Sequence, residues 1–241
     1  MVPIPVRRFV YASLLQPAAN AEPRDNRARR ATVCAFTLLA GALTLRWSLR
    51  VPPGDPLFYP ATSALALVWL VGGRLSGPVT PRADRRADGA SENHRIAESV
   101  LWGGLLLVLF LVGAVVVSRI PPLAGPVQGL LDHARRGSLP LVALLTAVNG
   151  LAEEYFFRGA LFQALPSRWR VGASTVLYAA VTSFSGIPLL VLAAAVLGAL
   201  VGLQRRATGG YLVPTVTHLV WSLGMLFLLP GALAMGARLL S

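Results

Sequence analysis

LWGGLLLVLFLVGAVVV, residues 101–117, is an almost wholly aliphatic stretch with no charged side chain. A helix that crosses the hydrocarbon core of a bilayer needs ~20 mostly apolar residues. With its flanks the stretch covers about 99–118, which is long enough to cross. It therefore predicts a membrane-spanning helix.

Similar apolar segments lie on both sides of this helix. Two precede it, at about 32–49 and 57–73. The Arg/Asp-rich segment 74–96 predicts a solvated loop, and IPPLAGPVQGLLDHARRG (120–137) predicts a loop with a short interfacial helix. Five further apolar segments follow, and Ser138 as N-cap with Pro140 in the first turn opens the first of them. These five segments are 138–165, 170–184, 187–204, 211–229 and 231–240.

We therefore expect an all-α, polytopic membrane protein with about eight transmembrane helices, the last of them short. A basic, cytoplasmic N-terminal segment covers 1–31, and the N-terminal transmembrane helices cover 32–137. A core with the helix described below covers 138–241. No internal repeat divides the chain further.

The composition favours a membrane protein over a soluble one. Hydrophobic residues make up 55% of the 241 residues and charged residues only 13%, with a net charge of +12. Every basic side chain is an arginine, and the arginines cluster between the apolar segments. This placement favours anionic lipid headgroups over nucleic acid as the partner. Cys34 is the single cysteine, which excludes an internal disulfide and a cysteine-based zinc site.

The distribution of arginines predicts the orientation, because cytoplasmic loops carry the excess of basic residues. With a cytoplasmic N-terminus and eight spans, both termini are cytoplasmic. The opposite side receives Arg50, Arg119, Arg135 and Arg136, with Arg46 near that end of the first helix. An all-arginine basic set is typical of high-GC bacterial genomes, so we expect a bacterial plasma membrane. The cytoplasmic segments hold Arg7, Arg8, Arg24, Arg27, Arg29, Arg30, Arg74, Arg82, Arg85, Arg86, Arg95, Arg168, Arg170, Arg205, Arg206 and Arg238.

Three charged residues lie inside the apolar segment 138–165, within NGLAEEYFFRGAL (149–161). A charge at mid-helix costs ~2.5–3.5 kcal/mol on insertion scales, so Glu153, Glu154 and Arg158 together need an explanation. Glu154 and Arg158 are one turn apart and can form an ion pair. Glu153 points about 100° away from Glu154 around the helix. A structural ion pair between helices explains only Glu154 and Arg158, whereas Glu153 is suited to act on water as a general base.

His218 lies inside another apolar segment, within GGYLVPTVTHLVWSLGM (209–225). A lone histidine there is most simply a neutral, hydrogen-bonded packing residue. Beside a buried pair of glutamates it also completes the minimum set for activating and holding water. His94 and His133 fall in predicted loops and are expected to be solvated. Gly198 and Gly202, extended upstream by Ala194, form a small-residue series that lets helix backbones approach closely.

Together these segments resemble the CPBP (type II CAAX-processing, abortive-infection) family of membrane-embedded proteases over roughly 138–229. Glu153, Glu154 and Arg158 match the family signature Glu-Glu-x-x-x-Arg, and the typical Gly159 follows. RRATGGYLVPTVTH (205–218) is similar to the family segment Arg-x-Thr-Gly-(small)-Leu-x-x-Pro, which precedes the later family histidine. His218 occupies that histidine position.

Two family positions differ in this chain. Tyr178-x-x-x-Thr182 aligns with a Phe-x-x-x-His element, and Ser222 stands in place of the asparagine that follows the later histidine by four residues. Both replacements are hydroxyl side chains, which can donate hydrogen bonds but are poor metal ligands.

The resemblance also implies roles for the residues that do match. Glu153 activates water, Glu154 and Arg158 support it, and His218 positions the water or binds a metal. It implies a divalent metal such as zinc, although Thr182 removes one histidine ligand. A catalytic zinc normally takes three protein ligands. Glu153, Glu154 and His218 supply three only if the ion pair with Arg158 is given up.

Three functions follow from these residues. The first is an intramembrane endopeptidase that cleaves peptides near the cytoplasmic face with a Glu-activated water. The second is a catalytically degraded relative that serves as a binding or regulatory scaffold, which Thr182 and Ser222 favour. The third is a small transporter, because buried charges also mark substrate or proton paths, but no matching pair of broken helices favours it. Membrane lipid and an unidentified peptide are the expected partners, and nucleic acid is not.

Overall fold

The computed structural model describes residues 6, 9–15, 27–79 and 92–239, and over these residues it is helical with no strand. The all-α expectation is therefore confirmed. The shorter elements are η1 (Tyr11–Leu15), α5 (Pro121–Arg136), η2 (Tyr155–Leu161), α7 (Phe162–Ala164) and η3 (Ser167–Trp169). The long helices are α2 (Arg27–Ser48), α3 (Phe58–Ser76), α4 (Glu92–Val117), α6 (Leu139–Glu154), α8 (Arg170–Ser183), α9 (Pro188–Thr208) and α10 (Leu212–Leu239).

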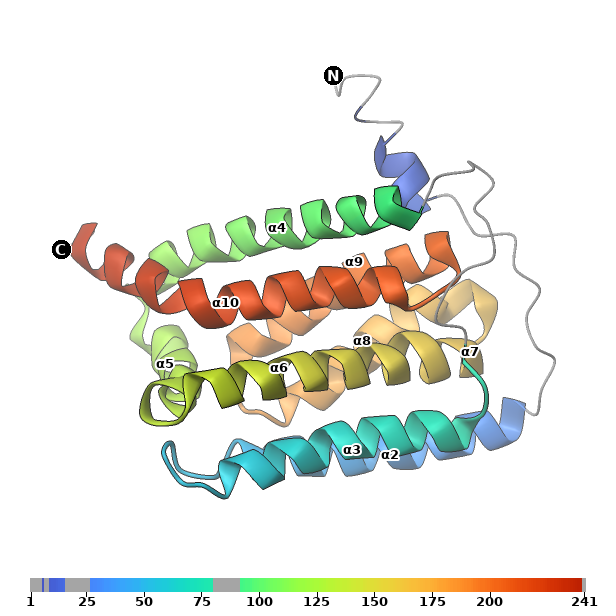
Figure 1. Ribbon diagram of the computed structural model, residues 1–241, viewed down its shortest axis with the longest axis horizontal. Coiled ribbons are helices and arrows are strands. Elements are labelled where there is room, and N and C mark those ends of the chain that lie inside the picture. Colours follow the sequence, from blue (N-terminus) through green and yellow to red (C-terminus); the bar gives the residue numbers. More distant parts are fainter. Residues whose placement is uncertain (1–5, 7–8, 16–26, 80–91, 240–241) are drawn as a thin grey trace.

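The long helices form a bundle in which α6 is central. In Figure 1, α4, α10, α6 and α3 lie side by side in one layer, with α8 and α9 behind them. α6 contacts α3 on one side and α10 on the other, and its continuation η2 also reaches α2, α8 and α9. α5 lies at one end of the bundle (Figure 1). The helix with the two glutamates is thus surrounded by other helices.

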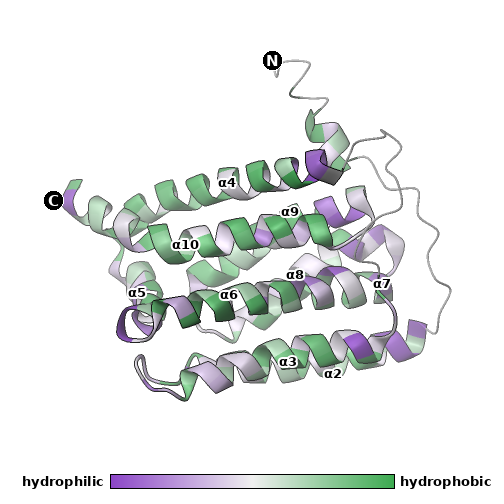
Figure 2. Ribbon diagram, in the orientation of Figure 1, coloured by the Kyte–Doolittle hydropathy of each residue, from purple (hydrophilic) through white to green (hydrophobic). Residues whose placement is uncertain are grey.

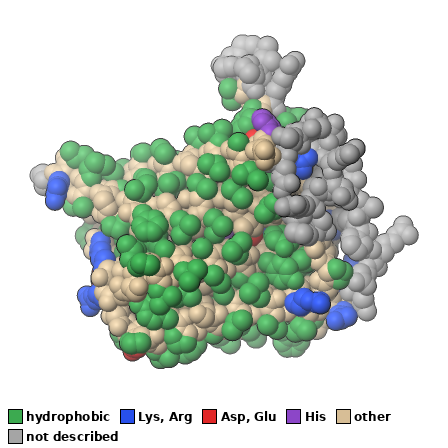
Figure 3. Space-filling model, viewed as in Figure 1, with side chains coloured by type: hydrophobic (Ala, Val, Ile, Leu, Met, Phe, Trp, Pro, Cys, Tyr) green, Lys and Arg blue, Asp and Glu red, His purple; other side chains and the backbone are tan. Residues whose placement is uncertain are grey.

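The surface of the bundle fits a lipid environment. Four of the described helices, α2, α4, α9 and α10, are long and apolar enough to cross a membrane by length and composition. Hydrophilic residues gather toward the two ends of the helices (Figure 2), and apolar side chains cover much of the visible face (Figure 3). On α4 the outward-facing side chains Leu105, Val108, Val112 and Val116 are all exposed. Exposed aliphatic surface of this extent is what hydrocarbon contact requires.

The expected count of about eight transmembrane helices is not confirmed, and one reason lies in α10. The two segments expected at 211–229 and 231–240 form this single helix, with Pro230 inside it. Proline is tolerated within membrane helices because neighbouring groups satisfy the backbone groups that it frees. α10 therefore ends at the end of the bundle opposite to the start of α2 (Figure 1). The two expected segments are therefore one helix and do not count as two separate spans.

Several boundaries differ from the expected ones. α4 begins at Glu92 rather than near 99, and residues 80–91 of the expected loop lie outside the described residues. Much of the expected basic segment 1–31 also lies outside them. Ser138 is the residue before α6, as expected, but its side chain makes no capping bond. Its backbone N–H instead donates to the Tyr59 hydroxyl, at 2.8 Å.

His133 corrects another expectation, because it is buried rather than solvated. Its Nε2 lies 2.9 Å from the carbonyl oxygen of Val51, and its ring centroid lies 4.3 Å from that of Phe58. The loop after α2 packs onto α5 and covers the ring. The side chain of His94, in contrast, is 60% exposed, as expected for a solvated histidine, and its Nε2 lies 3.3 Å from Oε1 of Glu98.

The small-residue series on α9 packs closely, as expected. A Cβ on Gly198 would lie 3.3 Å from Cδ1 of Tyr178 and 3.5 Å from Nη2 of Arg158. A Cβ on Gly202 would lie 3.3 Å from Cγ1 of Val171. These two glycines therefore bring α9 against α8 and against the arginine that follows the two glutamates.

Candidate functional site

The helix with the two glutamates widens immediately after them. Tyr155–Leu161 is a π-helical turn, and the N–H of Phe162 bonds to the carbonyl oxygen of Phe157, five residues back. Such turns are rare in proteins, and those that occur are often at functional sites. The expected helix 138–165 is thus continuous but locally wider, since α6, η2 and α7 follow one another. The widened turn holds Phe156, Phe157 and Arg158 in the interior.

Glu154 lies in a fully buried cluster. Its Oε1 accepts a hydrogen bond from Nη1 of Arg158 at 3.0 Å and lies 2.9 Å from Nδ1 of His218. The side chains of Glu154 and Arg158 are both 0% exposed. Nη2 of Arg158 donates to the carbonyl oxygen of Gly198 at 3.3 Å. We call Glu154, Arg158, His218 and this Gly198 carbonyl the ion-pair cluster, and it joins α6 and η2 to α9 and α10.

The ion-pair cluster is closed by further contacts of Arg158. Its carbonyl oxygen accepts a hydrogen bond from Nε of Arg205 at 2.6 Å, and Arg205 is itself buried. Its guanidinium carbon lies 4.9 Å from the centroid of the Tyr178 ring. A buried charge pair is tolerated only when its geometry and its remaining hydrogen bonds are good. The predicted pairing of Glu154 with Arg158 therefore forms, although Oε2 of Glu154 and Nε of Arg158 have no hydrogen-bond partner among the described residues.

Glu153 has the opposite surroundings. Its side chain is 19% exposed and lines a cavity. Its Oε2 accepts a hydrogen bond from the hydroxyl of Tyr178 at 2.6 Å. Nε2 of His218 lies 4.0 Å from the same oxygen, which is too long for a direct hydrogen bond. A water molecule can bridge two polar groups across such a gap.

His218 connects the two glutamates. Because Nδ1 faces the carboxylate of Glu154, the hydrogen-bond pattern assigns the ring proton to Nδ1. Nε2 then presents a lone pair toward Glu153. A carboxylate that fixes the tautomer of a functional histidine in this way is a common supporting arrangement. The sequence-predicted residues Glu153, Glu154, Arg158 and His218 are thus brought together.

The cavity at Glu153 has a volume of about 240 Å³. Several of its polar wall atoms are buried and have no hydrogen-bond partner among the described residues. These atoms are Oγ1 of Thr62, Oδ1 of Asn149, Nε1 of Trp221 and Oγ of Ser222. Their hydrogen-bonding capacity is not used by the described residues. The cavity therefore has both a basic carboxylate and unpaired donors and acceptors.

Asn149 and Tyr178 were not singled out as site residues from the sequence. Asn149 lies four residues before Glu153 on the same helix, and this spacing is the signal that could have identified it. Its amide nitrogen donates to the carbonyl oxygens of Thr62 and Leu145, at 3.2 and 3.0 Å. Tyr178 entered only as the aligned partner of Thr182, although it contacts Glu153 directly.

The two departures from the family pattern behave differently. Both Thr182 and Ser222 line the cavity. The hydroxyl of Thr182 donates to the carbonyl oxygen of Tyr178 at 2.8 Å, one turn back in its own helix. That of Ser222 has no partner among the described residues. Of these two hydroxyl groups, only that of Ser222 is therefore without a partner among the described residues.

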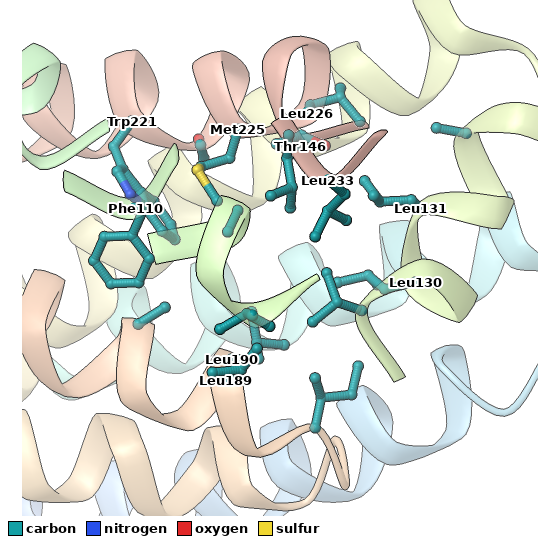
Figure 4. Close-up of a pocket in the computed structure, with 18 of the residues that line it drawn as sticks. Phe110, Leu130, Leu131, Thr146, Leu189, Leu190, Trp221, Met225, Leu226 and Leu233 are labelled. Atoms are coloured by element: carbon teal, nitrogen blue, oxygen red, sulfur yellow. The ribbon is translucent and has the colours of Figure 1, made fainter. Parts of the chain in front are cut away.

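A second, larger cavity adjoins the first. It has a volume of about 520 Å³, and Figure 4 shows Phe110, Leu130, Leu190, Met225 and Leu233 among its apolar walls. Both cavities share the wall residues Phe58, Leu130, Val142, Thr146, Leu190, Trp221 and Ser222. The cavity at Glu153 extends toward Leu49, Phe58 and α5. This is the end of the bundle opposite to the start of α2 (Figure 1).

The side chains at the site do not fit a catalytic zinc. Among the described residues, no group of three or more His, Cys, Asp or Glu side chains could hold a metal ion. Glu154 is fully buried and does not line the cavity, so Glu153 and Nε2 of His218 are the two His or Glu donors there. Catalytic zinc sites use three protein ligands. His218 therefore faces Glu153 without the further protein ligand that a catalytic zinc would need.

One family of known proteins matches part of the chain. Residues 135–224 match the family model described as type II CAAX prenyl endopeptidase Rce1-like. The matched segment contains Glu153, Glu154, Arg158 and His218. No match is found among curated proteins or among solved structures. Over residues 135–224, this all-helical chain is similar to the type II CAAX protease-like membrane proteins, and the match supports an assignment to the CPBP family.

Proposed function

We propose that the chain is an intramembrane endopeptidase in which Glu153 activates a water molecule to cleave a peptide bond. The facing position of Glu153 and His218 carries the proposal. Oε2 of Glu153 and Nε2 of His218 are 4.0 Å apart at the wall of a cavity, while Arg158 pairs with the neighbouring Glu154. One carboxylate thus remains a base, and a histidine lone pair lies beside it.

In the proposed reaction, a water bridges the Glu153 carboxylate and Nε2 of His218. Glu153 accepts a proton from the water while the water oxygen forms a bond to the carbonyl carbon of the peptide. The carbonyl oxygen becomes an oxyanion, for which Ser222 Oγ and Trp221 Nε1 are available donors. Glu153 then gives its proton to the amide nitrogen as the C–N bond breaks. A positioned general base contributes ~10²–10⁴-fold in rate.

The apolar cavity supports a substrate with large aliphatic or aromatic side chains next to the cleaved bond. Its walls are mostly aliphatic and aromatic, and it adjoins the cavity at Glu153, with which it shares wall residues. Such side chains leave lipid for the apolar cavity while the peptide group meets the polar atoms near Glu153.

The distribution of arginines supports an orientation in a bacterial plasma membrane. Most arginines lie at or before the start of α2, between the end of α3 and the first turn of α4, or where α9 ends and α8 begins. We propose that this end is cytoplasmic. The N-terminus is then cytoplasmic, and α10 carries the C-terminus to the other side. Because the cavity extends toward that other side, cleavage takes place away from the cytoplasmic face, which replaces the earlier expectation of cleavage near it.

A second candidate is a catalytically degraded membrane protein that acts as a binding or regulatory scaffold. The hydrogen bond from Thr182 to its own helix favours it, because the family histidine position then contributes no donor to the cavity. In a scaffold, Glu153→Gln leaves cellular function intact, whereas a bulky residue at Gly198, which packs against Tyr178 and Arg158, does not.

Cleavage of a peptide library by the purified protein, read by mass spectrometry, separates the two candidates. We expect the wild-type protein to cleave and Glu153→Gln to be slower by about 10²–10⁴-fold, with an unchanged circular dichroism spectrum. Retained activity in Glu153→Gln contradicts the proposal. If the wild-type protein cleaves no peptide and the Thr182→His/Ser222→Asn variant does, the natural protein is identified as the scaffold.

A further inference from the structure

We infer that Tyr178 is a positioning residue for Glu153 and takes over the task of the histidine that Thr182 replaces. The inference rests on the proposed function and extends it to a residue outside the family signature. Among the described residues, Tyr178 is the side chain that hydrogen-bonds to Glu153, with its hydroxyl 2.6 Å from Oε2. An O–H donor at this distance from a carboxylate forms a short, charge-assisted hydrogen bond.

The ring of Tyr178 is fixed from three sides. The Phe157 ring packs against it edge-on, with centroids 4.8 Å apart, and the Arg158 guanidinium carbon lies 4.9 Å from its centroid. On the third side is Gly198, where a Cβ would already lie 3.3 Å from Cδ1 of Tyr178. The hydroxyl therefore has one position, and the carboxylate that accepts from it is held in one orientation.

This hydrogen bond leaves the rest of the Glu153 carboxylate for water. Oε2 is held by Tyr178, and Oε1 takes no hydrogen bond from the described residues. Thr182 cannot do the same work, because its hydroxyl donates to the carbonyl oxygen of Tyr178. In this chain the donor that faces the base thus comes from the first position of the Tyr-x-x-x-Thr element, one helical turn before the family histidine position.

The test compares Tyr178→Phe with Tyr178→Phe/Thr182→His, which restores the family residues at both positions. Loss of a hydrogen bond to a charged group corresponds to about 10- to 100-fold in rate. We expect Tyr178→Phe to lower kcat by this factor with KM little changed, and the double variant to recover most of kcat. Tyr155→Phe, which removes a hydroxyl outside the cavity wall, is the matched control and should keep the wild-type kcat.

An infrared difference spectrum supplies a readout besides activity. The carboxyl band that Glu153→Gln removes identifies Glu153, and we expect Tyr178→Phe to shift this band while Tyr155→Phe leaves it in place. An unshifted band, or a fully active Tyr178→Phe variant, overturns the inference and leaves the proposed function standing. If Tyr178→Phe shifts the band but the wild-type protein cleaves no peptide, the proposed function is overturned, while the contact between Tyr178 and Glu153 stands.

Discussion

The two adjacent glutamates face two different regions of the molecule. Glu154 belongs to the ion-pair cluster, is 0% exposed and contacts Arg158 and His218. Glu153 is 19% exposed, lines a cavity of about 240 Å³ and accepts from Tyr178. Successive helical residues differ in direction by about 100°, which is enough to separate the two surroundings. The comparison teaches that one signature places a buried, paired carboxylate directly beside a carboxylate that faces a cavity.

The largest predicted effect removes the partner of the structural glutamate. Arg158→Met leaves a buried carboxylate without its cation, and breaking a buried pair in this way costs ~3–5 kcal/mol. We expect the free energy of unfolding, measured by titration from mild detergent into dodecyl sulfate, to fall by about this amount. The same measurement on Glu153→Gln should show little change, because Glu153 is not part of the ion-pair cluster.

A double variant sharpens this contrast. Arg158→Met/Glu154→Leu removes both charges together, and replacing a whole buried pair by apolar residues is often neutral. Stability should therefore recover in the double variant. Equal losses in the single and double variants would show that the carboxylate of Glu154 is not what makes Arg158 necessary.

Much of this division was predictable from the sequence, because it rests on local spacing. Glu154 and Arg158 are four residues apart, so their pairing follows from helix geometry, and 3.0 Å separates Oε1 from Nη1. Opposite charges inside an apolar membrane segment are costly and usually form an ion pair with each other. The same argument left Glu153 as the residue without a partner on its own helix.

Contacts between distant segments were not predictable. Tyr178 is separated from Glu153 by 25 residues, and their hydrogen bond depends on how α8 packs against η2. The burial of His133 depends on a carbonyl oxygen of the loop after α2. Pro230 predicted a helix boundary from local rules, and the packing of α10 against its neighbours overrode it.

A smaller effect distinguishes the two hydroxyl groups that replace family residues. Ser222 has an unpaired hydroxyl at the cavity wall, and its loss in Ser222→Ala removes a hydrogen bond worth ~0.5–1.5 kcal/mol. We expect cleavage to slow by up to about tenfold. Thr182→Val keeps the shape and removes only a bond to the same helix, so the cleavage rate should stay at the wild-type value. The reverse order of effects would assign the donor role to Thr182.

The smallest predicted effect concerns metal removal. Glu154 is fully buried and does not line the cavity, so it could become a third zinc ligand only by moving out of the ion-pair cluster, which would disturb its pairing with Arg158. We therefore expect dialysis against a chelator to leave the cleavage rate and the unfolding midpoint unchanged. Activity that disappears on chelation and returns with added zinc would mean that Glu154 changes partner. In that case both glutamates act on the substrate, and the separation between the ion-pair cluster and the cavity does not hold in the working enzyme.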